Sequence, residues 1–415
     1  MDPQFPADNA FQLYVIKGAK SAKMGASSLE EVGVKALSDY ELEVQLENPT
    51  PYFLDLVAFP SFFPINKKTD QETPEWANSA FTYVSNGPFS LRVWEHQHLL
   101  TFVKNPHYWD AEVVKLEEIH FAMVPNDTEL KMFEKKELDW FGSPFSSIPV
   151  DALASLKKEN NLNVKSFLAT DFLRCNTSHS LLSSTTLRKA LALALNRKEI
   201  VEHVTQGGQL PATGLVPTVM GLQENAYFTD SDLTSARQFF QQFLEDSQLS
   251  LETLPEITLI YSATDRNHLV AQAMQQQWYA ALGIHIKLES MERKVFFDRI
   301  SKKNYELACC NWVADFNDPI NFLEVFKYQK SSTNNTEWED PEYARLLDAS
   351  NLEIDPEKRK HFLKMSEQIL MNAMPIIPLF QASMVYLKEG KLKNVVVTSM
   401  GVMDLKWAHI EENKQ

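Results

Sequence analysis

The sequence predicts an α/β fold with more than one domain, and three observations support this prediction. Residues 257–313 alternate between apolar runs of strand length and longer amphipathic runs of helix length, which is the pattern of a βαβαβ unit with parallel strands. The chain has 415 residues, more than one hydrophobic core usually organises. Hydrophobic residues make up 44% and charged residues 23%, a balance typical of folded globular proteins.

The first third of the chain is predicted to form two hairpins, a further strand and a helix. VGVKAL and YELEVQLE alternate apolar and polar residues around Ser38-Asp39, and PFSLRVW and LLTFVKN flank a turn at Glu95 to His98. KLEEIHFAMV is a predicted strand, and NDTELKMFEKKELDWFG is a predicted helix with Asn126 or Asp127 as its N-cap.

The middle of the chain is predicted to contain a long helix and then the βαβαβ unit. SSTTLRKALALALNRKEIVEHVT is predicted as one helix that Gly207-Gly208 end. In the βαβαβ unit, Thr264 or Asp265 begins the first helix and Gly283 follows it. Open parallel sheets bind ligands at the carboxyl ends of their strands. The third strand is predicted over YELACCNWV, so the segment NWVADFNDP, residues 311–319, covers its carboxyl end and is expected at this edge.

Composition and motif searches exclude several classes of function. A net charge of −15 and a pI near 5.2 argue against a nucleic-acid-binding surface. The sequence has neither phosphate-binding glycine motif nor a G-x-S-x-G elbow, so it predicts no nucleotide cofactor and gives no support for a hydrolase. Adjacent Cys309 and Cys310 point to opposite faces of a strand, and His96 and His98 are predicted in a solvated turn, so no metal is expected.

The segment NWVADFNDP allows two interpretations. Asp315 and Asn317 could form a turn before Asp318-Pro319 begin a helix. Alternatively, Asp315 presents a carboxylate beside the aromatic rings of Trp312 and Phe316, a combination that suits an organic ammonium group. Local sequence alone leaves both interpretations open.

Motifs in a fixed order over nearly the whole chain indicate a family. In sequence order they are SNGPFSLRVWEHQHLLTFVKNPHYWD, LRCNTSHSLLSSTTLRKALALALNRKEIVEHV, LPATGLVPTVMG, NWVADFNDP, SSTNNTEW and IPLF. With these motifs the chain resembles the extracellular solute-binding proteins of peptide ABC importers, the oligopeptide- and dipeptide-binding family. The resemblance implies a two-lobe periplasmic-binding-protein (Venus flytrap) fold of the large peptide-binding type, with part of the first lobe missing. It also implies no enzymatic activity.

The resemblance assigns roles to individual residues. It makes Asp315 the acceptor of the peptide's α-ammonium group, and makes Asn311 and Val313 backbone partners of the peptide in strand addition. Trp312 and Phe316 are expected beside the ligand's side chains. Two asparagines are expected on the ligand side as well, namely Asn335 in SSTNNTEW and Asn176 in LRCNTS.

The resemblance also predicts partners, a location and domain boundaries. The expected partners are a peptide ligand and the permease subunits of an ABC transporter in the membrane, with the protein itself a monomer in the periplasm or cell envelope. Residues 1–68 are predicted as a remnant of the first lobe's small subdomain, residues 69–168 with 382–415 as the first lobe, and residues 169–381 as the second. The chain is expected to pass between lobes near 165–175 and 378–385.

Two departures from the family pattern keep alternatives open. Basic residues that relatives often carry near the ligand's carboxylate correspond here to Ile300 and Cys309. The opening MDPQFPADNAFQLYVIKGAK lacks the features of a signal peptide, and the N-terminal part of the family pattern is missing. The alternatives are therefore a truncated paralogue for a dipeptide, cell-wall peptide, nickel or haem, a remnant without a ligand, and a hydrolase.

Overall fold

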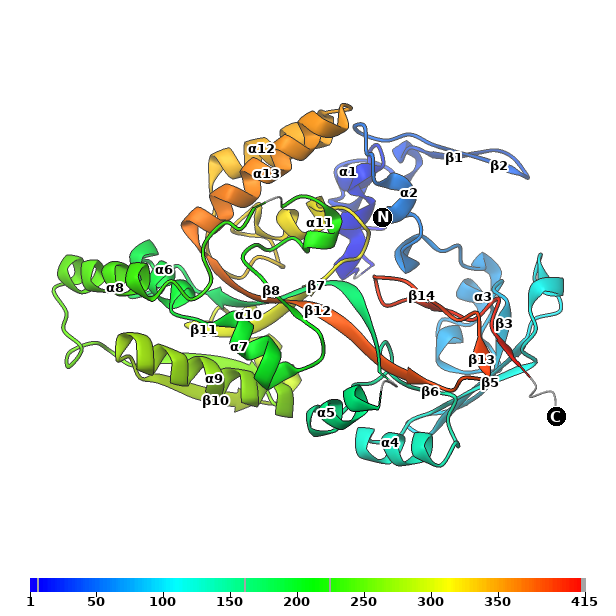
Figure 1. Ribbon diagram of the computed structural model, residues 1–415. Helices are drawn as coiled ribbons and strands as arrows, with labels where there is room; N and C mark the ends of the chain where they lie inside the picture. Colours follow the sequence, from blue (N-terminus) through cyan, green and yellow to red (C-terminus); the bar gives the residue numbers. More distant parts are fainter. Residues whose placement is uncertain (6, 160–161, 224, 412–415) are drawn as a thin grey trace. The chain divides into compact units, whose positions relative to one another are not determined.

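The computed structural model describes residues 1–5, 7–159, 162–223 and 225–411 (Figure 1). The chain folds into two compact units. Unit 1 consists of Met1–Phe63, Thr170–Arg197 and Pro211–Phe380, and unit 2 of Pro64–Ala169, Lys198–Leu210 and Gln381–Gln415. Two long strands, β7 (Asn163–Cys175) and β12 (Ile376–Lys388), each contain residues of both units.

The βαβαβ pattern forms the centre of unit 1, as the sequence predicts. Its strands and helices are β9 (Ile257–Ser262), α9 (Asp265–Leu282), β10 (Ile286–Met291), α10 (Arg293–Ser301) and β11 (Leu307–Val313). Strands β10 and β11 both pair with β9 in parallel, and the strand order of the sheet is β10-β9-β11-β7-β12-β6. Thr264 caps α9 by accepting a hydrogen bond from the Asn267 N–H, and Gly283 follows the helix with a φ of 73°.

Further helices of unit 1 pack in pairs. They are α6 (Thr185–Leu193), α8 (Leu233–Ser247), α12 (Pro341–Leu352) and α13 (Pro356–Ala373). Helices α12 and α13 lie side by side (Figure 1), and each begins with an aspartate N-cap followed by proline. The indole of Trp278, which is fully buried on α9, donates to the Leu191 carbonyl on α6 and so joins that helix to the βαβαβ unit.

Arg188 on α6 connects two helix ends. Only 3% of its surface is exposed, and its guanidinium donates to backbone carbonyls rather than to a carboxylate. The acceptors are the carbonyls of Leu182, Ser183, Ala373 and Met374 and the hydroxyl of Thr185. Carbonyls at the end of α13 have no intrahelical partner, so one side chain satisfies groups that would otherwise be buried without a donor.

The N-terminal segment belongs to unit 1. It contains the hairpin β1 (Val34–Ser38) and β2 (Glu41–Val44), and short helices. These are η1 (Asp8–Val15), α1 (Ala19–Lys23), η2 (Leu29–Glu31), α2 (Phe53–Leu56) and η3 (Pro60–Phe62). Two long-range contacts connect this segment to the region after β11: Gln12 hydrogen-bonds Asp315, and Tyr52 stacks on Phe316. The lobe boundaries that the family resemblance implies stay a prediction.

Unit 2 contains the second predicted hairpin and its neighbours. Strands β3 (Phe89–Glu95) and β4 (Leu99–Lys104) form the hairpin, and β5 (Glu118–Ala122) pairs with β4. The other elements include α3 (Lys67–Glu72), η4 (Trp76–Asn78), η5 (Ala111–Val113), α4 (Asn126–Glu134), β6 (Trp140–Gly142) and α5 (Val150–Lys158). Near the C-terminus, β13 (Leu392–Lys393) pairs with β16 (His409–Ile410) and β14 (Val396–Val397) with β15 (Met403–Asp404). Pro125 is the N-cap of α4, one or two residues before the predicted N-caps Asn126 and Asp127.

The predicted helix over residues 183–205 is interrupted. Helix α6 ends at Leu193, and α7 (Arg197–Glu199) and the π-helix η6 (Ile200–Thr205) follow. The Asn196 N–H donates to the Gln277 side chain and the Arg197 N–H to the Asp230 carboxylate, in place of helical carbonyls. Tertiary acceptors therefore replace the helix ladder at this point, although the local sequence favours a continuous helix.

Glu367 on α13 is a buried carboxylate that holds a loop of unit 1. Its Oε1 accepts the N–H groups of Leu215 and Val216, and its Oε2 accepts the hydroxyl of Tyr227. Burial raises the pKa of Glu367 to about 7, and these hydrogen bonds act in the opposite direction. The folded chain therefore binds this proton more tightly than the unfolded chain does.

This shift predicts a pH-dependent stability. Between the ordinary pKa of 4.5 and the folded value of about 7, stability is expected to fall as pH rises, by about 3 kcal/mol in all. Glu367→Gln keeps an oxygen for both N–H groups and removes the titration, so its stability should change less over this interval. Urea denaturation at pH 5 and pH 8 measures the difference, and Glu357→Gln, an exposed change on the same helix, is the control. Parallel pH profiles for wild type and Glu367→Gln would contradict the prediction.

Candidate functional site

Strand β11 has one edge that is only partly paired. Its described pairing with β9 consists of Leu307 opposite Leu259 and Ala308 opposite Ile260, whereas β9 continues alongside β10 as far as Ser262. The two strands thus separate after Ala308, and residues 309–313 of β11 lie beyond the described pairing with β9. Unpaired backbone N–H and C=O groups at a strand edge are a template for an added strand.

Asp315 lies just beyond the end of β11 and is half-buried. Its backbone N–H donates to Asn321 Oδ1 at 3.1 Å, and its Oδ2 accepts from Gln12 Nε2 at 3.0 Å. Burial raises the pKa of the Asp315 carboxyl, while hydrogen bonds from Asn321 and Gln12 lower it in part. A carboxylate that is partly desolvated in this way would be stabilised in its ionised form by a bound cation.

Gln12 is a site residue that sequence reasoning missed. Its side chain is 5% exposed and belongs to the N-terminal segment, 303 residues away from Asp315 in the sequence. While Nε2 donates to Asp315, its Oε1 is buried and has no hydrogen-bond partner among the described residues. No local pattern marks Gln12, because a lone glutamine is ordinarily a surface residue even beside apolar neighbours such as Phe11 and Leu13.

Three other predicted residues lie on β11 before Asp315. Trp312 is partly buried, and its Nε1–H donates to the Asn321 Oδ1 that also accepts from the Asp315 N–H. Asn311 is exposed and Val313 is 36% exposed, and the two share a face because strand residues alternate. The structure therefore brings Asn311, Trp312, Val313 and Asp315 together at one strand end.

Phe316 has a different place from the one that the sequence suggests. It is 5% exposed and its ring stacks on Tyr52, with centroids 4.8 Å apart and planes 10° from parallel. The guanidinium of Arg359 lies 5.6 Å from the Tyr52 ring and forms a bidentate pair with Asp318 at 2.8 Å. Phe316 thus packs inside unit 1, and its contacts fix the backbone that carries Asp315.

Asn176 and Asn335 also use their side chains within the fold. Asn176 Nδ2 donates to the carbonyls of Lys303 and Tyr305, and its Oδ1 accepts from Ser178. Asn335 Nδ2 donates to the Ser332 carbonyl, and the residue has a φ of 54°. Both are less than 9% exposed, so their roles in the structure are those of turn and loop residues.

The second half of NWVADFNDP leads into a short helix, which begins one residue later than the sequence predicts. Asp318 Oδ1 accepts from the Ile320 N–H, where the short helix α11 (Ile320–Leu323) begins and leads into η8 (Glu324–Phe326). Pro319 precedes the helix rather than being its first residue. The segment therefore divides into a capping half at Asp318 and a half-buried carboxylate at Asp315.

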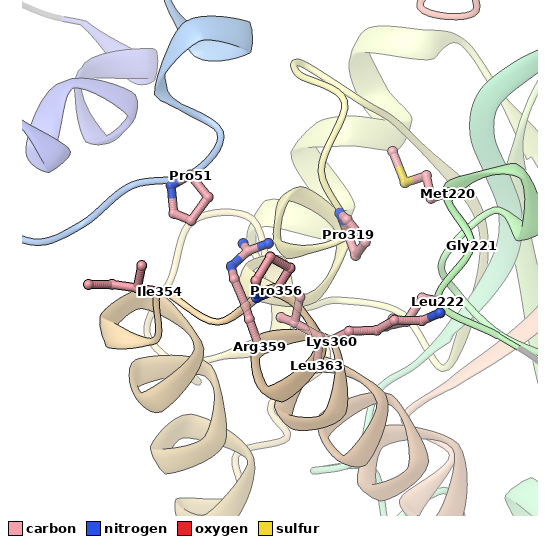
Figure 2. A pocket seen from close by; sticks show the side chains of 10 residues that line it. All are labelled: Pro51, Met220, Gly221, Leu222, Pro319, Ile354, Pro356, Arg359, Lys360 and Leu363. Atoms are coloured by element: carbon pink, nitrogen blue, oxygen red, sulfur yellow. The ribbon is translucent and has the colours of Figure 1, made fainter.

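A cavity of about 210 Å³ lies elsewhere in unit 1 (Figure 2). Figure 2 shows the Arg359 side chain rising from α13 between Pro51 and Pro319. The lining residues are Pro51, Met220, Gly221, Leu222, Pro319, Ile354, Pro356, Arg359, Lys360 and Leu363. None of the seven predicted ligand residues lines this cavity. It is mostly apolar, and the Arg359 charge beside it is already paired with Asp318.

The described residues also bear on metal binding and on membrane-spanning helices. No group of three or more histidine, cysteine, aspartate or glutamate side chains in the described ranges is arranged to hold a metal ion. No helix among the residues that the structure describes combines the length and apolar character needed to cross a membrane.

Comparison with known proteins assigns the family. Residues 5–334 match the model of the family described as bacterial extracellular solute-binding proteins, family 5 Middle. The chain belongs to this family. This family 5 protein is 40% identical over 407 residues to the oligopeptide-binding protein OppA of Bacillus subtilis (strain 168). The matched region covers 97% of this chain and 75% of that relative. It is 33% identical over 416 residues to the dipeptide-binding protein DppE of the same organism, with 98% and 75% covered.

Solved structures confirm the fold of this family 5 protein. OppA of Listeria monocytogenes, solved with a bound peptide, has a TM-score of 0.82 at 26% identity, with 99% of this chain and 81% of that one covered. The predicted two-lobe α/β fold of the peptide-binding type is therefore confirmed, as is the family resemblance. The named relatives are binding proteins rather than enzymes.

Proposed function

We propose that this family 5 protein binds oligopeptides as the substrate-binding component of an ABC importer. The observation that carries the proposal is a strand edge that leads to a half-buried acid: residues 309–313 lie beyond the described pairing with β9, and Asp315 follows directly. A peptide can add to such an edge through its backbone and place its ammonium group at the carboxylate.

Within this proposal, four of the predicted residues contact the ligand. Asp315 accepts the α-ammonium group, Asn311 and Val313 exchange backbone hydrogen bonds with the peptide, and Trp312 forms an aromatic wall. Gln12 joins this set as the residue that orients Asp315. Phe316, Asn176 and Asn335 support the site through their packing and hydrogen bonds. Affinity that rests on the peptide backbone and one terminal charge tolerates varied side chains.

The proposal also covers the protein's oligomeric state, its location and its partners. The protein acts as a monomer on the outer side of the membrane, where it delivers peptides to permease subunits, and it does so without catalysis. The names of its relatives support this role, since OppA and DppE are named for binding oligopeptides and dipeptides.

N-terminal acetylation of the ligand tests the proposal. A mixture of free pentapeptides is expected to bind with an affinity that calorimetry can measure, and the acetylated peptides are expected to bind more than about tenfold more weakly, because they lack the ammonium group. Mass spectrometry of the purified chain should detect mixed peptides. Absence of binding by free peptides would refute the function, and equal binding of both forms would refute the role of Asp315.

A further inference from the structure

Arg174 is a buried cation without a hydrogen-bond or ion-pair partner among the described residues. It lies on β7, one residue before the strand's end, and is 7% exposed. It forms no hydrogen bond and no ion pair with any residue that the structure describes, and its Nε is buried without an acceptor. Its guanidinium carbon lies 5.8 Å from the centroid of the Phe172 ring.

The other buried arginines have hydrogen-bond acceptors within the described residues. Among the described residues, four arginines are buried, and three of them donate at least two hydrogen bonds from the guanidinium. Arg188 donates to carbonyls at two helix ends, Arg197 to the Pro378 carbonyl and Asp230, and Arg359 to Asp318. A buried cation without a partner is costly, so a retained one points to a partner that the chain itself does not supply.

The position of Arg174 connects it with the proposed peptide strand. β7 is the neighbour of β11 in the sheet. The backbone N–H of Asn176, directly after β7, donates to the Glu306 carbonyl, directly before β11. Burial raises the pKa of the Cys310 thiol on β11, and the positive charge of Arg174 acts in the opposite direction. Cys310 is one of the residues beyond the described pairing with β9.

The terminal nitrogens of Arg174 are the atoms that a ligand can reach. Only Nε belongs to the fully buried polar atoms that lack a partner. Nη1 and Nη2 do not belong to them, although no described residue accepts a hydrogen bond from either atom. They therefore lie at the accessible surface of an otherwise buried residue. A guanidinium edge of this kind matches a carboxylate, which it can bind through two parallel hydrogen bonds.

We propose that Arg174 binds a carboxylate of the peptide ligand. This inference rests on the proposed function, because it needs a peptide along β11. Cys310 and Asp315 are five positions apart, a span of at most about 18 Å, which an extended peptide of about five residues covers. Two groups can then supply the carboxylate: an acidic side chain, or the C-terminus of a short peptide.

A matched peptide series distinguishes these sources. The reference peptides are pentapeptides with free termini and one glutamate, which is placed at each position in turn. Each reference peptide has two partners. One carries glutamine in place of the glutamate, and the other carries an amide in place of the terminal carboxylate. For wild type, we expect one of these changes to weaken binding by about tenfold or more, since hydrogen bonds between charged groups are the strong ones. Loss with glutamine identifies the side chain, and loss with the amide identifies the terminus.

Two variants assign the effect to Arg174. Arg174→Met keeps the shape and removes the charge, so the sensitivity seen in wild type should disappear. Arg237→Met, an exposed arginine on α8, makes the same change in net charge and should keep the wild-type pattern. In urea denaturation, Arg174→Met should be at least as stable as wild type, because it removes an unpaired buried charge.

The possible results separate this inference from the proposed function. If wild type binds the reference peptide but none of the glutamine or amide peptides differs, Arg174 receives no ligand carboxylate. The same conclusion follows if Arg174→Met keeps the wild-type sensitivity, or if it is destabilised relative to wild type, since it would then be a structural group. If wild type binds no peptide at all, the proposed function itself fails.

Discussion

Asp315→Asn is expected to weaken the binding of peptides with a free N-terminus by about 2–5 kcal/mol. The physical reason is that the variant keeps the shape of the side chain and its hydrogen bond from Gln12, but leaves a bound ammonium group without a counter-ion in a partly desolvated place. Isothermal titration calorimetry measures the change directly. An aspartate that served only as an exposed turn residue would cost less than about 1 kcal/mol.

Two controls make this result specific. N-acetylated peptides lack the ammonium group, so the variant should bind them about as weakly as wild type does. Asp246→Asn, an exposed change on α8, alters the net charge by the same amount and should leave affinity unchanged. If Asp315→Asn binds free peptides as tightly as wild type while its circular dichroism is unchanged, the turn interpretation of Asp315 is correct and the ammonium role is wrong.

Arg188→Met is expected to lower the free energy of unfolding by about 3–5 kcal/mol. The variant would leave carbonyls of Leu182, Ser183, Ala373 and Met374 buried without the donor that they now share. A methionine fills much of the same volume, so lost hydrogen bonds rather than a cavity dominate the cost. Urea denaturation followed by circular dichroism measures it.

Arg345→Met is the matched control for this prediction. Arg345 is an exposed arginine on α12 that pairs with Glu342 on its own helix, and such a pair contributes less than about 1 kcal/mol. Equal stability of Arg188→Met and Arg345→Met would show that the carbonyls at the end of α13 find other donors. Arg188 and Arg174 thus differ in their expected effect on stability: replacing Arg188 should destabilise the protein, and replacing Arg174 should not.

The sequence by itself determined the elements whose signals are local. Both hairpins and the βαβαβ unit follow from apolar periodicity, and Thr264 and Gly283 bound α9 because capping depends on residues within one turn. The same local reasoning placed NWVADFNDP at the carboxyl end of β11, and the order of the quoted motifs was sufficient for the family. The hydrogen bond from the Ile320 N–H to Asp318 at the start of α11 was predictable for the same reason, since donor and acceptor are two residues apart.

Only the tertiary structure decided which side chains are free to meet a ligand. The sequence predicts Phe316, Asn176 and Asn335 beside the ligand. In the structure Phe316 stacks on Tyr52. The Asn176 and Asn335 side chains donate hydrogen bonds to the carbonyls of Lys303 and Ser332, respectively. Gln12 reaches Asp315 across 303 residues, and no periodicity carries information over that separation. Burial and hydrogen-bond satisfaction depend on what the rest of the chain brings to a residue, so a paired Arg188 and an unpaired Arg174 are indistinguishable until the chain is folded.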